Sequence, residues 1–247
     1  MTVTVAQILR HPIKSLGRED LGAVTLHQGQ TMPWDRTWAV AHEHSKADGT
    51  SWARCQNFLR VASSPALAAA TSTLDEVSQT LTLRHPARPD LTVNPDADPG
   101  AIVDWVQPLV ASTRSAAAQI MRVPGRGMTD SDYPSITLAN LASHRAVEDQ
   151  IGHPLSLHRW RCNLWLDGLD PWAEVSWIGK TLRVGSAELT VREPTTRCTN
   201  VLANPDTGLR DADVLAALDH FGHQDFSVLA EVTASGTVTS GDTVTLL

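Results

Sequence analysis

Residues 181–192 read Thr-Leu-Arg-Val-Gly-Ser-Ala-Glu-Leu-Thr-Val-Arg, which is the pattern of two short strands around a turn. Thr181–Val184 and Glu188–Arg192 are rich in β-branched and apolar residues, and such residues fit a pleated, half-buried surface. Gly185 and Ser186 lie between them, and glycine readily adopts the backbone conformations of two-residue hairpin turns. The stretch therefore predicts a β-hairpin.

Similar short runs recur on both sides of this hairpin. Alternating or apolar runs occupy residues 3–8, 21–27, 36–42, 81–83, 91–93, 226–232 and 244–246. Gly, Pro and Asp separate these runs, and these residues mark turns. The spacing predicts a meander or small barrel rather than βαβ units, and hence a mostly β (α+β) fold with a few helices.

Three segments have the pattern of helices. Leu138–Ile151 presents one apolar face and ends at Gly152, a residue that commonly terminates helices. Ala101–Val110 is a shorter candidate. Asp211 is a good N-cap residue type, and we expect it to begin a short helix.

One stretch separates the chain into two parts. Four prolines lie between Arg84 and Gly100, together with several aspartates, and this composition is typical of a boundary. A chain of 247 residues is long enough to bury a sizeable core as one large or two small domains. We therefore predict a division into residues 1–100 and 101–247.

Composition narrows the class of protein. A net charge of −7 gives no support for a general nucleic-acid binder, which normally carries a basic field. The sequence contains three cysteines without a CxxC spacing, which argues against a disulfide scaffold and against an iron–sulfur cluster with four cysteine ligands. Residues 1–15 lack the pattern of a signal peptide, and no apolar run is long enough to span a bilayer. We expect a cytoplasmic protein with no membrane or nucleic-acid partner.

The sharpest chemical signal is Arg192-Glu-Pro-Thr-Thr-Arg-Cys-Thr-Asn. Cys198 follows a predicted strand and a proline, with Arg197 beside it and Arg192 near it in sequence. Cationic neighbours favour the thiolate, which is the form that binds metals or attacks electrophiles. A soft thiolate suits a thiophilic metal. The alternative is a buried, inert cysteine that serves as a small hydrophobe.

Two further clusters have the residue types of a phosphate site. Arg159 and Arg161 are two residues apart, so on a strand they would share one face that Asn163 continues. The alternative is a row of exposed arginines on an edge strand. Lys14 and Ser15 follow a predicted strand and combine a point charge with a hydroxyl donor. The P-loop pattern is absent, which argues against nucleoside triphosphate binding, and no GxSxG motif indicates a serine hydrolase.

In their order and spacing these segments resemble the MOSC domain, the molybdenum-cofactor sulfurase C-terminal domain. The motifs that carry the resemblance are Arg159-Trp-Arg-Cys-Asn-Leu-Trp-Leu-Asp-Gly, Trp172-Ala-Glu, Trp177-Ile-Gly, Leu182-Arg-Val-Gly, Pro194-Thr-Thr-Arg-Cys, Asn204-Pro-Asp-Thr-Gly and Ser240-Gly-Asp. His11–Ser15 and Asp35-Arg-Thr-Trp-Ala-Val are similar to the β-barrel domain that precedes MOSC in the mitochondrial amidoxime-reducing component and its bacterial relatives. The implied fold is a β-barrel MOSC domain, residues 101–247, behind a smaller N-terminal MOSC β-barrel domain, residues 1–100.

The resemblance also implies a site between the two β-rich parts that holds a pterin-based molybdenum cofactor (molybdopterin). Cys198 would be the catalytic thiolate ligand to molybdenum. The expected cofactor-binding residues are Lys14, Ser15, Arg36, Ser135, Arg159, Arg161, Asn163 and Arg197. One departure is Cys162, which stands where the family usually has proline and brings a second thiol near the arginine row.

The activity that the resemblance implies is that of an oxidoreductase, which reduces N-hydroxylated small-molecule substrates at the Cys-ligated molybdenum. The sequence shows no flavin motif and no cluster cysteines, so electrons would come from a separate donor protein. The alternative is a non-catalytic protein that binds the cofactor or carries sulfur as a Cys198 persulfide.

Overall fold

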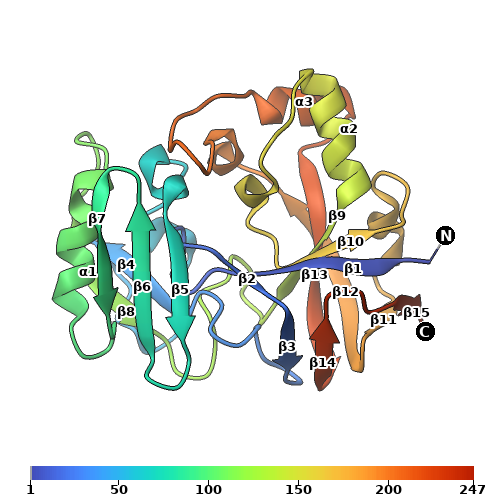
Figure 1. Cartoon of the computed structure of the whole chain (residues 1–247), viewed down its shortest axis with the longest axis horizontal. Helices are drawn as coiled ribbons and strands as arrows, with labels where there is room; N and C mark the ends of the chain where they lie inside the picture. The colour runs from blue at the N-terminus through green and yellow to red at the C-terminus, as the bar shows by residue number, and fades with distance from the viewer. Residues whose placement is uncertain (1) are drawn as a thin grey trace.

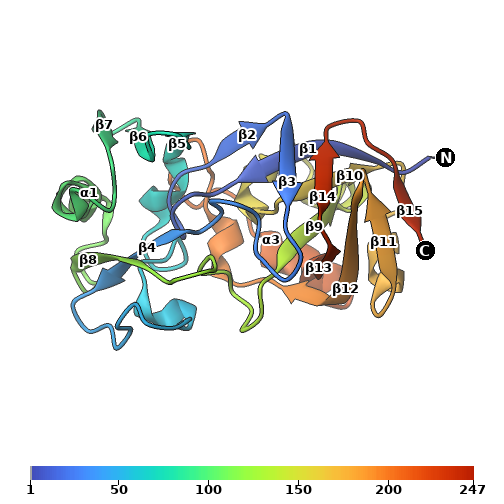
Figure 2. The same cartoon turned by 90° about the horizontal axis from the view of Figure 1, so that it is seen from below.

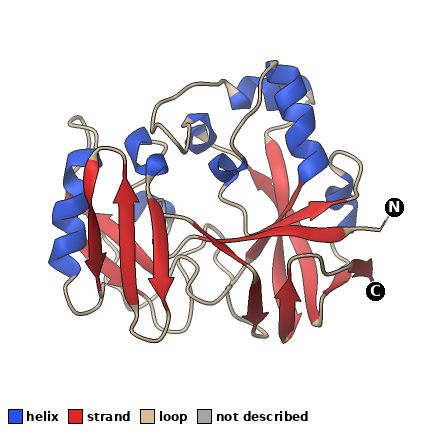
Figure 3. Cartoon of the chain, in the orientation of Figure 1, coloured by secondary structure: helices blue, strands red, loops and turns tan. Residues whose placement is uncertain are grey.

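The computed structural model describes residues 2–247 and consists mostly of strands, as Figure 3 shows. The expected mostly β fold with a few helices is confirmed. Three α-helices lie at the margins of the molecule: α1 flanks the N-terminal half, and α2 and α3 pack together over one end of the larger sheet (Figure 1). Among residues 2–247, no helix is both long and apolar enough to cross a membrane.

A curled eight-stranded sheet forms the larger part of the molecule, with the order β15-β11-β12-β13-β9-β10-β1-β2. Its strands are β1 (Thr4–Arg10), β2 (Glu19–Leu21), β9 (Ile136–Asn140), β10 (Leu164–Asp167), β11 (Thr181–Val184), β12 (Ala187–Thr196), β13 (Asp225–Ala234) and β15 (Val244–Leu246). The predicted hairpin is present: β11 pairs with β12, and Val184 lies opposite Ala187. Strand β1 comes from the start of the chain, so the N-terminal residues complete the C-terminal sheet.

A two-stranded sheet of β3 (Ala23–Leu26) and β14 (Gly236–Thr239) closes the curl (Figure 2). Leu26 and Val238 are fully buried and share one apolar core with Val184 and Val228 of the large sheet. The predicted run 21–27 is thus two strands that break at Gly22, each paired with a different partner.

The N-terminal half has its own sheets and its own core. One sheet pairs β4 (Trp38–His42) with β8 (Ala117–Arg122), and another contains β5 (Thr71–Asp75), β6 (Thr80–His85) and β7 (Arg88–Val93). Helix α1 (Pro99–Val106) packs on β7 and β8, and Trp105 joins Trp38 in the core. The division between residues 100 and 101 stays a prediction; α1 and β8, which span or follow that point, pack with the first half.

One βαβ unit lies inside the large sheet, so the expectation of a fold without such units is wrong. Strands β9 and β10 pair in parallel and are connected through α2 (Leu141–Ile151). The predicted helix began at Leu138 because this residue of β9 lies three residues before Leu141 and so continues the apolar spacing of α2. All five residues of β9 are buried, and a strand covered on both faces shows no alternation that would reveal it.

Of the two predicted helix ends, the one at Gly152 is confirmed and the one at Asp211 is wrong. Gly152 terminates α2 at a φ of 87°, as predicted. Helix α3 (Val214–His220) is capped by Asp213, whose carboxylate accepts the Ala216 amide at 3.1 Å. The prediction of Asp211 as the cap is wrong, because Asp211 contacts Arg159 and Asn204 instead.

Candidate functional site

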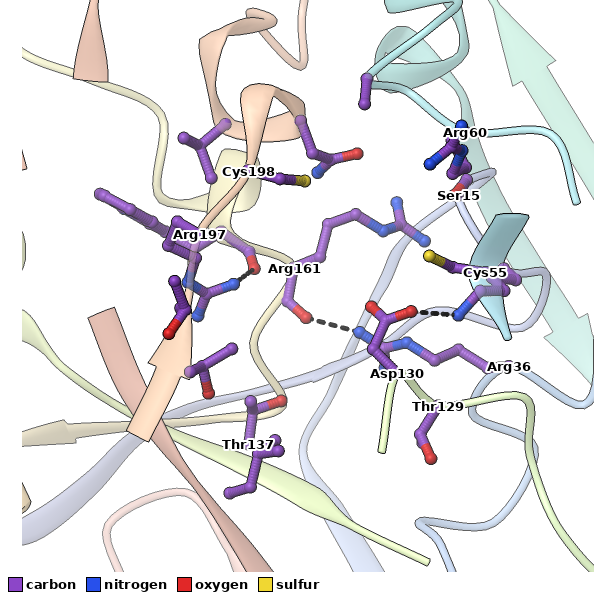
Figure 4. A pocket seen from close by; sticks show the side chains of 18 of the residues that line it. Ser15, Arg36, Cys55, Arg60, Thr129, Asp130, Thr137, Arg161, Arg197 and Cys198 are labelled. Carbon is purple, nitrogen blue, oxygen red and sulfur yellow. Dashed lines mark hydrogen bonds and ion pairs between the residues drawn. The ribbon is translucent and has the colours of Figure 1, made fainter. Parts of the chain in front are cut away.

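A cavity of about 300 Å³ lies between the two halves, and most of the predicted site residues line it (Figure 4). Those brought together there are Lys14, Ser15, Arg36, Ser135, Arg161, Asn163, Arg197 and Cys198. Arg159 does not line this cavity. Its buried guanidinium donates to the Val201 carbonyl at 2.9 Å and to Asp211 at 3.2 Å, which ties the loop after Cys198 to the body of the protein.

Cys198 stands where the chain leaves the large sheet. Strand β12 pairs with β13 as far as Thr196, whose hydroxyl donates to Asp225 at 2.6 Å. The next residues turn away into a short 3-10 helix, Thr199–Leu202, and Cys198 precedes its first residue. The side chain of Cys198 is exposed and lines the cavity, so the structure excludes the alternative of a buried cysteine.

Arg197 does not extend freely beside Cys198. Its guanidinium donates to the carbonyls of Trp160 and Phe226 at 2.9 and 2.7 Å and lies 3.2 Å from the Cys162 sulfur. It also lies over the stacked rings of Trp160 and Phe226. The thiol that Arg197 contacts is therefore the buried Cys162, and the cation is fixed at the cavity wall. Arg192 lies outside the cavity, where it pairs with Glu231.

Arg161 enters the cavity from a turn and not from a strand, so the prediction of a strand face shared with Arg159 is wrong. Residues Leu157–Trp160 form a 3-10 helix, and Arg161 follows at a φ of 52°, in the left-handed region. This turn points the guanidinium toward the N-terminal half, where it donates to the carbonyls of Gly17 and Ile13 at 3.2 and 3.3 Å. Burial and the neighbouring Arg36 lower the pKa of Arg161 to about 9.

Arg36 is held by a buried carboxylate. It donates to Asp35 and, at 2.8 Å, to the carbonyl of Arg161. Burial alone would lower the pKa of Arg36, but the neighbouring carboxylates of Asp35 and Asp130 together raise that pKa above its usual value. Burial alone would raise the pKa of Asp35, but Arg36 and His11 lower it well below its usual range. Asp35 is thus the fixed counter-ion of this wall.

Lys14 and Ser15 lie in the turn that follows β1. The Lys14 ammonium is buried and donates to the Met128 carbonyl at 2.7 Å and to the Asp130 carboxylate at 2.5 Å. Ser15 has a φ of 64°. Ser15, Arg36 and Arg161 are non-glycine residues in the left-handed region, and such strained positions cluster at functional sites.

Asn163 and Ser135 brace the cavity wall. The Asn163 side chain accepts from the Thr137 amide and hydroxyl and donates to the Leu9 carbonyl at 3.2 Å, so it links β9 to β1. The Ser135 hydroxyl lies 2.6 Å from that of Ser131. Both side chains are buried, and their surfaces at the cavity are small.

Among the cavity residues that the sequence did not identify, Cys55, Arg60 and Asp130 bring a thiol or a charge. Asp130 lies in the Gly-rich loop that precedes β9, and no local pattern marks it, because its partner Lys14 is 116 residues away. Cys55 and Arg60 come from the segment after β4, where the sequence has neither repeat nor motif. Only the fold brings these residues to the site.

The charge of the cavity is strongly one-sided. Lys14, Arg36, Arg60, Arg161 and Arg197 line it, against the single carboxylate of Asp130, in a chain whose net charge is −7. Arginine and lysine side chains converging on one hollow form a binding site for phosphate or carboxylate groups. The exposed Cys198 thiol adds a soft ligand beside this anion site. Within residues 2–247, no three His, Cys, Asp or Glu side chains gather as a metal site of their own.

Family models account for nearly the whole chain. The MOSC N-terminal beta barrel domain matches residues 2–121, and the MOSC domain matches residues 128–245. The chain belongs to the MOSC domain proteins. The cavity of this MOSC protein takes Lys14 and Arg36 from the first matched region and Arg161 and Cys198 from the second.

Solved structures with a similar arrangement include two bacterial proteins. YuaD from Bacillus subtilis is 11% identical over 99% of this chain and 94% of its own, with a TM-score of 0.46. YiiM from Geobacillus stearothermophilus is 19% identical over 45% of this chain, with a TM-score of 0.37, and the alignment spans 53% of the YiiM chain. A search of the curated proteins finds no match to this MOSC protein.

Proposed function

We propose that this MOSC protein binds a pterin-based molybdenum cofactor and uses it as an oxidoreductase that reduces N-hydroxylated small molecules. The observation that carries the proposal is the position of Cys198: an exposed thiol lines the same cavity as cationic side chains from both halves. A thiolate suits a thiophilic metal, and the cations suit the anionic phosphate of the cofactor.

The electrostatics of the cavity wall support this fit. Arg161 is a largely buried cation beside another cation, Arg36, and its lowered pKa reflects that unfavourable setting. The carboxylate of Asp35 already serves Arg36 and the His11 amide. A bound phosphate would supply the negative charge that Arg161 lacks, and we assign Lys14, Ser15, Arg36 and Arg161 to the phosphate and pterin end.

The protein's own groups have separate tasks in this proposal. Cys198 holds the metal, and Arg197, fixed by the Trp160 and Phe226 carbonyls, keeps positive charge at the base of the Cys198 loop. Asn163 and Thr137 keep the strands behind the site in register. When bound, the cofactor supplies the two-electron redox step that side chains cannot perform. Electrons would come from a separate donor protein.

The direct test is turnover by cofactor-loaded protein. Protein from a host that makes the cofactor, with its molybdenum content measured, should reduce an amidoxime or a hydroxylamine when an artificial electron donor is supplied. The same protein from a host that lacks the cofactor serves as the control and should be inactive. Absence of turnover by fully loaded protein over a broad set of N-oxygenated compounds would contradict the reductase assignment.

A second function, sulfur transfer, is favoured by the exposure of Cys198. A solvent-accessible thiol can carry sulfur as a persulfide. Metal analysis and intact-mass measurement on one preparation distinguish the two functions. Near-stoichiometric molybdenum supports the reductase, whereas metal-free protein with one additional sulfur atom on Cys198 supports the carrier.

A further inference from the structure

Arg60 stands out in the segment after β4 because the chain directs its side chain into the cavity. Its neighbours Leu59 and Val61 are 6% and 1% exposed and pack in the N-terminal core. Arg60 lies between these two buried residues, but it is only half-buried and does not belong to that core. It lines the same cavity as Cys198, as Figure 4 shows.

The backbone around Arg60 is well held. The Leu59 amide donates to the Val40 carbonyl at 2.8 Å, and the Arg60 carbonyl accepts the amides of Ser63 and Ser64 at 3.0 and 2.9 Å. The segment is also tied to the C-terminal half, because Arg210 donates to the Ala62 carbonyl at 2.8 Å. The base of the Arg60 side chain is therefore fixed at the junction of the two halves.

Its guanidinium, in contrast, makes no hydrogen bond or ion pair with any group of residues 2–247. Each other cation of the cavity is engaged: Lys14 with Asp130, Arg36 with Asp35, Arg161 with two carbonyls and Arg197 with the Phe226 carbonyl. Arg60 is half-buried, so its charge is partly shielded from water and strengthens a contact with a ligand.

We infer that Arg60 binds a carboxylate of the substrate and so determines specificity for anionic N-hydroxylated compounds; this inference rests on the proposed function. A cofactor that stays bound is expected on preorganised groups, as Lys14, Arg36 and Arg161 are. A substrate enters and leaves at every turnover, and Arg60, the cavity cation that has no partner within residues 2–247, is free to meet it. Its planar fork matches a carboxylate in two parallel hydrogen bonds.

The test compares benzamidoxime with 4-carboxybenzamidoxime, which differ in one carboxylate. In cofactor-loaded protein, Arg60→Gln should lower kcat/KM about tenfold for the carboxylated compound, mainly through KM, since a hydrogen bond to a charged group is lost. The neutral compound should change by less than about twofold. Arg60→Lys should recover part of the loss, because it restores the charge without the fork.

Arg54→Gln is the matched control. Arg54 lies in the same segment and carries the same charge, but it is exposed and does not line the cavity. It should leave both compounds unchanged, which separates a contact from a long-range charge effect. An equal loss for both compounds in Arg60→Gln, or no loss for either, would contradict the inference.

Two further measurements distinguish a substrate contact at Arg60 from a cofactor contact and from failure of the proposed function. Pterin content should be the same in wild type and Arg60→Gln; a lower content would assign Arg60 to the cofactor phosphate and overturn the substrate role. If the loaded protein reduces neither compound, calorimetric binding decides. Weaker binding of 4-carboxybenzamidoxime to Arg60→Gln still supports the contact, and equal binding contradicts it.

Discussion

Arg161 and Arg60 line the same cavity, but they differ in whether protein groups hold their guanidinium groups. Arg161 comes from the C-terminal half, sits in a left-handed turn and is held by two carbonyls. Arg60 comes from the N-terminal half, and its guanidinium has no partner among residues 2–247. This difference is what we expect of a cavity that binds a permanent anionic ligand through preorganised groups and a transient ligand through an adaptable contact.

Two carboxylates, Asp35 behind the cavity wall and Asp130 in the cavity lining, repeat this contrast. Asp35 is 1% exposed and serves Arg36 and the His11 amide, whereas the Asp130 side chain is 73% exposed and meets Lys14 from the open side. The first belongs to the scaffold, and we expect the second to compete with anionic ligands for Lys14. Substitutions of Asp35, Arg161 and Asp130 test this division between anchored and open groups.

Loss of the anchored carboxylate should have the largest effect on stability. Asp35→Asn leaves the buried Arg36 without its counter-ion and should lower the free energy of unfolding by about 3 kcal/mol at pH 7 in urea titrations. Since the pKa of Asp35 is lowered in the folded protein, its contribution is present above the unfolded pKa of about 4 and is lost as the pH falls further. The difference from wild type should therefore shrink in acid. Asp130→Asn, the exposed control, should lower the free energy of unfolding by less than about 1 kcal/mol. Equal losses in the two variants would contradict the division between anchored and open groups.

Loss of the anchored cation should weaken anion binding. In cofactor-free protein, Arg161→Gln should lower the affinity for inorganic phosphate about tenfold, because a charged hydrogen-bond donor is removed. Calorimetric titration measures this directly. Arg145→Gln makes the same change of charge on α2, where Arg145 pairs with Asp167, and should bind phosphate like wild type. The idea of a phosphate site fails if both variants bind alike.

The pH dependence of phosphate binding should identify Arg161 as well. With a pKa of about 9, Arg161 loses its charge between pH 8 and 10, so wild-type affinity for phosphate should fall across that window. Because this pKa is lower in the folded protein, the unfolded chain binds the Arg161 proton more tightly. The contribution of Arg161 to the stability of cofactor-free protein therefore becomes more favourable as the pH rises through about 9. Arg161→Gln should lack both steps, and a flat wild-type profile would contradict the assignment.

Loss of the open carboxylate should have the smallest effect, in the opposite direction. Asp130→Asn frees the Lys14 ammonium, so phosphate affinity of the cofactor-free protein should rise about threefold. The same titration measures it. A fall in affinity would show that Asp130 positions Lys14 for the anion and does not compete with it.

Much of the fold could be predicted from local patterns. The hairpin at 181–192 and the strand before Cys198 follow from β-branched residues and turn glycines, and these interactions are close in sequence. Strand β9 could not be predicted in the same way, because it is buried on both faces and shows no alternation.

The sequence predicted many of the residues of the site but not how they are positioned. The motifs around Cys198, Lys14 and Arg161 point to a thiolate near a phosphate site, and the fold brings these residues to one cavity. The Arg161 guanidinium donates to carbonyls more than 140 residues away in sequence, so no local pattern reveals its position. Cys55, Arg60 and Asp130 reach the cavity only through the packing of the two halves.

Molybdenum content decides whether Cys198 is the metal ligand. Wild type, Cys198→Ala and Cys55→Ala would be purified from one cofactor-competent host and analysed for metal and pterin. We expect near-stoichiometric molybdenum in wild type and in Cys55→Ala, which removes another thiol of the same cavity, and a loss of most of the molybdenum in Cys198→Ala. Full molybdenum in Cys198→Ala, or a loss in Cys55→Ala alone, would contradict the assignment of Cys198 as the ligand.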